Sequence, residues 1–180
     1  MSDLLSQIEK DLKSGKSILS TCDELKESDF LTKLISHFVP QAEEGSPRVL
    51  LLFADDDKAR TLGEFLKKSL RSLDLTVDVI VEKGNKLQQR NDLFDGTEII
   101  VGSTKRICEL YFQNGFNINK LKFFAAFDLN EQFRKSWRGQ IIRIMESLPK
   151  SRIVLHGTNL DDERMEALLE LVNDNLLRYE

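Results

Sequence analysis

Short apolar runs alternate with longer amphipathic segments along this chain. The apolar runs are rich in Ile, Leu, Val and Phe and are bounded by turn or charged residues, which is the pattern of β-strands. They lie at residues 17–21, 48–54, 76–81, 97–102, 122–127 and 152–156. Residues 49–53 are apolar throughout, which is typical of a strand buried on both faces of a parallel sheet.

Apolar residues at helical spacing fill the segments between these runs. The stripes predict helices at residues 30–38, 59–73, 141–148 and 165–176, and a further N-terminal helix within residues 1–13. We expect Thr158 or Asn159 to cap the last helix. Strands that alternate with helices in this way predict an α/β fold, with a doubly wound, mostly parallel sheet of about six to seven strands flanked by helices.

Length and composition narrow the class of protein. A chain of 180 residues suits a single domain over residues 1–180, with residues 40–47 as a surface loop. It is 41% hydrophobic, too much for a disordered chain, yet no run reaches the roughly 20 apolar residues of a membrane-spanning helix. The N-terminal segment is too charged for a signal peptide, and Cys22 and Cys108 lack the spacing of metal ligands. We therefore expect a cytoplasmic chain with two reduced thiols, no metal site and no membrane contact.

Ligand sites in such folds lie at the carboxyl ends of the strands, so candidate chemistry is expected in the residues that follow each strand. After the first strand no glycine occurs between Lys16 and Glu44, although a phosphate-binding loop needs glycines. Lys26 is the one residue there with phosphate-binding chemistry. We interpret the junction as a solvated helix start with Asp23 as its N-cap.

Two other junctions carry charge. Three consecutive aspartates, Asp55 to Asp57, follow the second strand and are expected to cap the next helix rather than to bind a cation. The fourth strand is followed by hydroxyl and basic side chains, a combination that suits a phosphate group. These residues are Ser103, Thr104, Lys105 and Arg106. The net charge of −4 means that any contact with nucleic acid has to rest on such a local patch.

In order and spacing, these junctions resemble the N-terminal RecA-like domain of DEAD-box RNA helicases. Residues 98–107 read EIIVGSTKRI, where the family has IIVGTPGRI. Residues 126–131 fall on the family's VLDEAD, and residues 156–158 fall on its SAT. Gly84 lies where the family has a paired-glycine turn, and residues 50–59 fall on ALILAPTRELA. The resemblance extends from residue 13 to about residue 172 and implies a RecA-like fold of the P-loop NTPase type.

The resemblance also implies a vestigial nucleotide cleft. Lys26 matches the phosphate-binding lysine of the family, Asp128 matches its metal-binding aspartate, and Thr158 belongs to the motif at the end of the sixth strand. Glu27 replaces the hydroxyl that binds magnesium, and Leu129 replaces the glutamate that orients water. Within residues 1–180 we expect no second helicase domain and hence no arginine finger. Since phosphoryl transfer needs all these groups together, we expect no catalytic residue, no ATPase activity and no cofactor.

For RNA, the resemblance implies backbone contacts at Gly84 and at Ser103, Thr104, Lys105 and Arg106. Asp56 stands where the family has a phosphate-binding arginine, so only weak, salt-sensitive contact with single-stranded RNA is expected. The preferred function is therefore a catalytically inactive binding or scaffold module with an unidentified protein partner. Four aromatic residues are candidates for partner contacts, although core packing is preferred for them: Phe112, Phe116, Phe133 and Trp137.

Two alternatives stay open. The first is a residual RNA helicase domain that binds ATP and Mg²⁺ weakly and works with a second RecA-like domain in trans. The second is a phospho-acceptor receiver domain, suggested by Asp55 and Asp56 after a strand. We disfavour the receiver because its acceptor aspartate should end the third strand from Arg48, where Gly102 and Ser103 stand, and Asp128 comes one strand too late.

Overall fold

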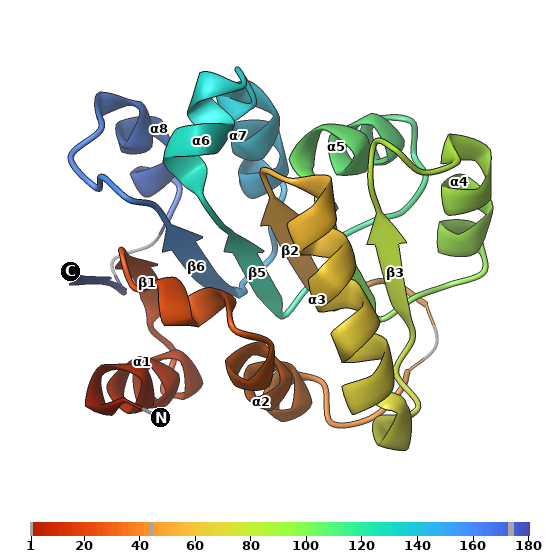
Figure 1. The fold of residues 1–180 in the computed structure, drawn as a ribbon, viewed down its shortest axis with the longest axis horizontal. Coiled ribbons are helices and arrows are strands. Elements are labelled where there is room, and N and C mark those ends of the chain that lie inside the picture. Colours follow the sequence, from red (N-terminus) through yellow and green to blue (C-terminus); the bar gives the residue numbers. More distant parts are fainter. Residues whose placement is uncertain (1, 44, 173–174) are drawn as a thin grey trace.

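The computed structural model describes residues 2–43, 45–172 and 175–180, and these form one parallel β-sheet with helices on both faces (Figure 1). Within them the sheet has seven strands in the order β3-β4-β2-β5-β6-β1-β7. The strands are β1 Ser17–Ser20, β2 Val49–Phe53, β3 Val77–Ile80, β4 Ile99–Ser103, β5 Phe123–Ala126, β6 Arg152–His156 and β7 Leu176–Tyr179. Every neighbouring pair is parallel, so the predicted fold class is confirmed.

The helices divide into two layers. The first three pack with one apolar cluster on one face of the sheet, where Figure 1 shows them side by side; the others pack with a second cluster on the opposite face. They are α1 Asp3–Lys13, α2 Ser28–Phe38, α3 Asp56–Ser69, α4 Lys86–Phe94, α5 Thr104–Phe112, α6 Leu129–Arg134, α7 Arg138–Glu146 and α8 Glu166–Leu169. Short 3₁₀ turns are η1 Asp23–Lys26, η2 Arg71–Leu73 and η3 Glu163–Met165. None of the described helices is long and apolar enough to cross a membrane.

Burial explains why the apolar runs predicted the strands well. Every residue of β1, β2, β4 and β5 is buried, because helices cover both faces of the sheet centre. The two edge strands, β3 and β7, are partly exposed. The strand order also excludes the receiver alternative. A receiver would place the strands corresponding to β2–β6 in the order β3-β2-β4-β5-β6, whereas here β4 lies between β3 and β2.

The prediction for the last segment is wrong. Apolar spacing predicts a helix at residues 165–176, but α8 ends at Leu169 and β7 begins at Leu176 and pairs in parallel with β1; residues 173–174 lie outside the described residues. Neither Thr158 nor Asn159 caps a helix. Both lie in the loop after β6, and both donate their backbone N–H groups to the Asn130 carbonyl oxygen, at 2.8 and 3.1 Å. Apolar residues three and four positions apart suit both one long helix and a short helix followed by an edge strand. The spacing alone therefore does not distinguish these two structures.

Two glycines give opposite predictions for stability. A Cβ on Gly102 of β4 would lie 1.8 Å from the Ile80 carbonyl oxygen, whereas a Cβ on Gly139 of α7 would meet no atom within 4 Å. We expect Gly102→Ala to destabilise the protein by about 1–3 kcal/mol, since strand backbone has to move. Gly139→Ala should stabilise it by about 0.5–1 kcal/mol through helix propensity. Urea unfolding of both variants checks this, and equal effects would contradict the packing described for β4.

Candidate functional site

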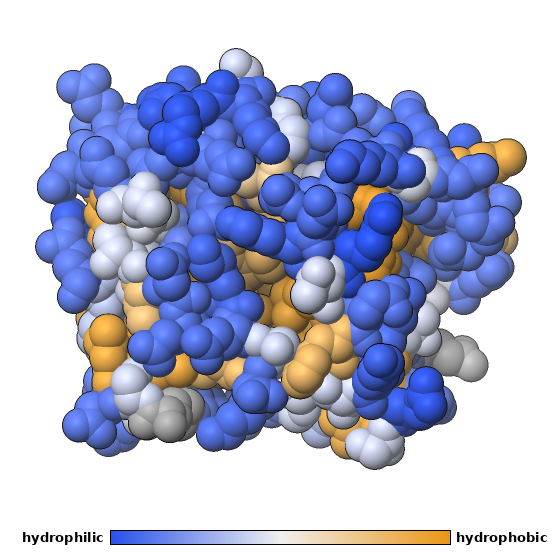
Figure 2. Space-filling model, in the orientation of Figure 1, coloured by the Kyte–Doolittle hydropathy of each residue, from blue (hydrophilic) through white to orange (hydrophobic). Residues whose placement is uncertain are grey.

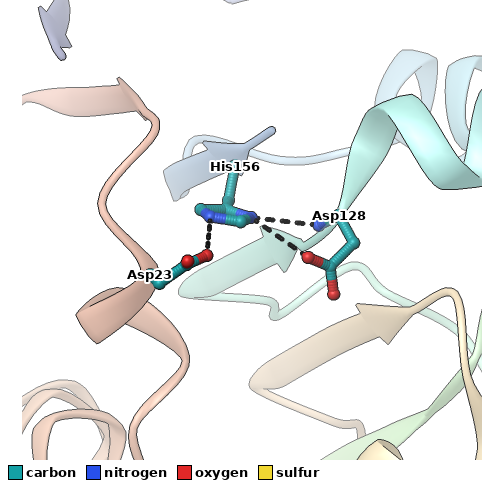
Figure 3. Close-up of side chains that lie close together, drawn as sticks. All are labelled: Asp23, Asp128 and His156. Atoms are coloured by element: carbon teal, nitrogen blue, oxygen red, sulfur yellow. Dashed lines mark hydrogen bonds and ion pairs between the residues drawn. The ribbon is translucent and has the colours of Figure 1, made fainter. Parts of the chain in front are cut away.

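Four charged or titratable side chains from distant parts of the chain meet at the carboxyl ends of β1, β5 and β6. Asp23 and Lys26 come from η1, which follows β1; Asp128 follows β5, and His156 ends β6. Figure 3 shows the Asp23 and Asp128 carboxylates on either side of the His156 ring. The site therefore lies where ligands bind in open α/β sheets, at the strand ends.

The Lys26 ammonium lies between the two carboxylates. Its Nζ is 2.9 Å from Asp128 Oδ1 and 3.1 Å from Asp23 Oδ1. Burial lowers the pKa of Lys26, but hydrogen bonds and attraction to Asp128 and Asp23 outweigh burial, so the pKa lies above its usual value. A second ammonium, that of Lys58 at the start of α3, lies 3.5 Å from Asp128 Oδ2. Asp128 thus faces two cations of its own chain.

His156 is fully buried, and both of its ring nitrogens have partners. Nδ1 accepts the backbone N–H of Asp128 at 3.1 Å, so the proton belongs on Nε2, which donates to Asp23 Oδ1 at 3.1 Å. Burial, helped by the nearby Lys26 charge, lowers the pKa of the imidazole below the ordinary histidine value of 6.5. His156 is therefore a buried ring with both nitrogens engaged.

Asp23 does not have the predicted role of N-cap. Cys22 occupies the N-cap position of η1 and makes no side-chain capping hydrogen bond. The Asp23 carboxylate instead turns toward Lys26 and His156, and the hydrogen bond from Lys26 is the main reason that the pKa of Asp23 is lowered. A 3₁₀ helix does start at Asp23, so only the N-cap role is wrong. One of the partners of Asp23, His156, lies over 100 residues away in sequence, and local capping rules do not reveal it.

Several groups that a nucleotide and its magnesium ion would need after β1 are already engaged within the fold. A phosphate-binding loop presents free backbone N–H groups. Here the N–H groups of Cys22, Leu25 and Glu27 bond to Ser20 Oγ, Cys22 O and Glu24 O. The Asp128 carboxylate, which would be the metal ligand, is paired with Lys26 and Lys58.

Three of these residues could hold a metal ion by geometry alone. Ligand atoms of Asp23, Asp128 and His156 lie within 4.8 Å of one another. In this arrangement, however, the Lys26 ammonium supplies the positive charge between the carboxylates, and both His156 nitrogens are already engaged. A divalent ion would have to displace Lys26.

A pocket of about 500 Å³ opens beside this cluster, between η1 and α3. Its lining includes the basic side chains of Lys26 and Lys58 and the apolar side chains of Phe53, Leu62 and Phe65. Figure 2 shows hydrophobic atoms in a hollow between the positions of α2 and α3 in Figure 1. No local sequence pattern indicates this pocket, because its residues come from separate elements.

Thr158, the third residue of the predicted nucleotide site, makes its hydrogen bonds with Asn130. Its side chain is exposed, and its hydroxyl lies 3.3 Å from Asn130 Oδ1. Among the three predicted residues, the structure therefore brings together Lys26 and Asp128. Their binding of a nucleotide stays a prediction.

The residues predicted to contact RNA are used mainly within the fold. Ser103 is buried at the end of β4, and the Thr104 hydroxyl donates to Gln132. The Arg106 guanidinium donates to the carbonyl oxygens of Glu82 and Gly84, at 2.8 and 3.2 Å. A Cβ on Gly84 would lie 2.2 Å from Gln89 Nε2, so the turn at Gly84 packs tightly against α4.

Lys105 is the exposed member of the predicted RNA-binding group. Its side chain is about half exposed, and its ammonium lies 3.8 Å from a Glu82 oxygen. Close by, Asp55 caps α3 as predicted. Asp56 accepts the backbone N–H groups of Glu82 and Lys83 at 3.1 and 3.0 Å. The surface beside Lys105 is therefore acidic as well as basic, and RNA contact stays a prediction.

The preference for core packing is met by two of the four candidate aromatic residues, Phe133 and Trp137, which are buried. Phe112 and Phe116 are partly buried and pack against the second apolar cluster. The large exposed apolar side chains of the described residues lie elsewhere, at Phe65, Leu87 and Phe94. Sequence reasoning missed them because spacing along a helix does not show which apolar residues face solvent.

The charge of Asp128 can be tested apart from its backbone conformation. Asp128 has φ 52°, a left-handed conformation that asparagine tolerates. We expect Asp128→Asn to destabilise the protein by about 1–3 kcal/mol, because Lys26 loses a nearly buried partner. Asp74→Asn is the matched control, since Asp74 is also left-handed but exposed. Chemical denaturation measures the free energy of unfolding of both variants. Equal destabilisation by the two substitutions would contradict the ion pair.

The buried His156 predicts a pH dependence. Its pKa is lower in the folded state than the ordinary histidine value of 6.5, so the unfolded chain binds the proton more readily. The stability that this group contributes is complete above about pH 6.5 and is lost as the pH falls toward the folded-state pKa, by at most about 1.4 kcal/mol per pH unit. His156→Gln should lose less stability than the wild type between about pH 7.5 and about pH 5.5, roughly one unit either side of the ordinary histidine pKa. If the two proteins lose equal stability over this pH range, His156 is not the group with the lowered pKa.

Comparison with known proteins identifies the fold. The sequence matches no protein-family model and no curated protein. A hypothetical ATP-dependent RNA helicase from Sulfolobus tokodaii superposes with a TM-score of 0.83 at 13% identity, over 99% of this chain and 52% of that one. A DEAD box protein from Methanococcus jannaschii gives 0.80 at 16% identity, over 93% of this chain and 46% of that one.

A third solved structure is a complex. Dbp5 of S. cerevisiae, bound to Nup159, Gle1, IP6 and ADP, superposes with a TM-score of 0.79 at 18% identity, over 100% of this chain and 48% of that one. The chain thus spans about half the length of the solved chains that it matches. Together with the strand order and the position of the site, these matches show that the chain has the RecA-like fold of DEAD-box helicases.

Proposed function

We propose that this chain is a catalytically inactive binding or scaffold module built on a helicase RecA-like domain. The observation that carries the proposal is the position of the Lys26 ammonium, 2.9 Å from Asp128 and 3.1 Å from Asp23. By the resemblance, Lys26 and Asp128 are the side chains that would hold the phosphates and the metal. Here they neutralise one another, so a nucleotide would have to break this ion pair before it could bind.

The neighbouring positions support the same proposal. Leu129, which stands in place of the water-orienting glutamate, is fully buried in the second apolar cluster. Glu27, in place of the magnesium-binding hydroxyl, follows a 3₁₀ turn whose first residues are acidic. Loss of one such group lowers the rate of phosphoryl transfer by orders of magnitude, and here several are replaced together.

Residual nucleotide binding, with a second RecA-like domain in trans, is the second candidate. It is favoured by one observation: Lys26 and Lys58 both reach Asp128, so a phosphate that displaced this carboxylate would meet two ammonium groups. In that case ATP and Mg²⁺ would be bound weakly, and catalysis would need groups from the other domain.

For the module itself we propose a protein partner in the cytoplasm, with weak contact to single-stranded RNA through Lys105 as a secondary activity. The Dbp5 structure contains the partner proteins Nup159 and Gle1, which supports protein binding as a use of this fold. The half-exposed Lys105 and the internal use of Arg106 support an RNA contact with few phosphates, and hence weak, salt-sensitive binding.

Calorimetric titration with Mg²⁺ and a non-hydrolysable ATP analogue tests the inactive cleft. We expect no binding heat from the wild-type chain at micromolar concentrations. Heat that disappears in Lys26→Ala but persists in Lys33→Ala, a surface lysine on α2, would overturn the proposal in favour of residual nucleotide binding. A parallel titration with single-stranded RNA should give heat that fades with salt and is lost in Lys105→Ala.

A further inference from the structure

The pocket between η1 and α3 offers groups that the ion-pair cluster does not use. Its volume of about 500 Å³ is within the range of small-molecule sites in proteins. Its lining includes three apolar side chains, those of Phe53, Leu62 and Phe65. Because Phe65 is 37% exposed, a ligand in this pocket would remove an apolar ring from water, which favours binding.

The two ammonium groups that line the pocket are already paired with carboxylates. Lys26 Nζ is 2.9 Å from Asp128 Oδ1 and 3.1 Å from Asp23 Oδ1. Lys58 Nζ is 3.5 Å from Asp128 Oδ2. Only 11% of the Asp128 side chain is exposed, so salt screens this attraction little. An anionic ligand would therefore have to separate these pairs before either lysine could bind it.

The lining also contains two further carboxylates. They belong to Glu27, which stands just before α2, and to Asp57, which lies in the first turn of α3. Both residues are exposed, and among the residues that the structure describes neither carboxylate has an ion-pair or hydrogen-bond partner. The cap of α3 is Asp55, so the Asp57 carboxylate is not needed there. Because the lysines are neutralised, the charge that the pocket presents to a ligand is negative.

We propose that this pocket binds an organic cation, which is an ammonium group on an aromatic or aliphatic body. The body packs against Phe53, Leu62 and Phe65. The ammonium group meets the carboxylates of Glu27 and Asp57. Aromatic rings also attract cations at their faces, so Phe53 and Phe65 suit both the body and the charge of such a ligand. The cation is a free amine or a lysine side chain of a protein partner, because both present the same group.

Two hydroxyl groups in the lining support the same ligand. They belong to Ser28 and Thr61, and their oxygens can accept hydrogen bonds. An ammonium group has three N–H donors, so it can use acceptors at the start of α2 and on α3 at once. A carboxylate or phosphate ligand has no such match to the acceptors of this pocket.

The proposal rests on the observed pairing of Lys26 and Lys58 and not on the proposed function. A cation held by Glu27 and Asp57 needs none of the groups that would hold a nucleotide. The binding of an amine and the binding of a nucleotide are measured in separate titrations, so the failure of one proposal is distinguishable from the failure of the other.

Titration with matched small molecules tests the charge preference. Phenylethylammonium, phenylethanol and phenylpropanoate share a phenyl ring and differ in the charge of the polar end. We expect phenylethylammonium to bind the full chain with a dissociation constant on the order of 1 mM at low salt, read from the backbone-amide NMR shifts of Ser28 and Thr61. Phenylethanol should bind about threefold more weakly or worse, and phenylpropanoate more weakly still. Equal affinities, or tightest binding of phenylpropanoate, would overturn the proposal.

A second titration distinguishes the two sources of the cation. N-acetyl-lysine methylamide presents the lysine side chain without a free α-amino group. Binding as tight as that of phenylethylammonium assigns the pocket to a lysine of a protein partner, and weaker binding assigns it to a free amine; both results support a cation site. If neither amine gives a saturable shift at about 10 mM, roughly ten times the expected dissociation constant, the proposal is overturned.

Substitution of the carboxylates tests which groups hold the ammonium. Glu27→Gln and Asp57→Asn should each weaken the binding of phenylethylammonium about threefold or more and leave that of phenylethanol unchanged, since only the charge is removed. Asp74→Asn, at an exposed aspartate that follows η2 and lies outside the lining, is the matched control and should change neither. Unchanged amine binding in the double variant, or an equal loss in the control, would overturn the proposal.

Truncation of the exposed ring tests the apolar contact. Phe65→Ala should weaken the binding of phenylethylammonium and phenylethanol alike, by about fivefold or more. Phe94→Ala, at an exposed phenylalanine on α4, is the matched control and should leave both dissociation constants unchanged. Equal effects of the two variants, or no effect of Phe65→Ala, would show that the amine binds elsewhere and would overturn the proposal.

Discussion

The ion pair of Lys26 with Asp23 and Asp128 is the interaction on which the chemistry of this protein depends. It joins η1 to the end of β5, and His156 extends it to the end of β6. A buried carboxylate needs a compensating charge or a ligand. In this chain the compensating charge comes from its own lysines, so the carboxylates of the cleft are neutralised without a ligand. The proposed loss of nucleotide chemistry follows from that balance.

The sheet determines which residues meet at this cleft. Four strands are buried along their whole length, so their register is fixed by packing on both faces. Each parallel strand ends at the same edge, and the residues that follow it are delivered there. The site therefore lies at the edge where open α/β sheets bind ligands, and here its side chains bind one another.

The central strands and four of the described helices, α1, α2, α3 and α7, could be predicted from the sequence, because continuous apolar runs and helical stripes report burial directly. The prediction failed at residues 165–176, where the same apolar spacing suits one long helix or a short helix followed by an edge strand. Asp23 was likewise assigned to a helix cap, since no local pattern reveals a partner more than 100 residues away. The outward face of α4 escaped prediction for a related reason: spacing cannot tell whether an apolar residue such as Phe94 points into the protein.

The ion pair can be tested by measuring the pKa of Lys26 by NMR on the side-chain Cε and Nζ resonances. We expect a pKa above the ordinary value for lysine, because the ammonium is held by Asp128 and Asp23, and no change in this pKa when Mg²⁺ and an ATP analogue are added. An ordinary or lowered pKa, or one that moves on addition of the nucleotide, would show that Lys26 is free to bind phosphate and would overturn the proposed inactive cleft.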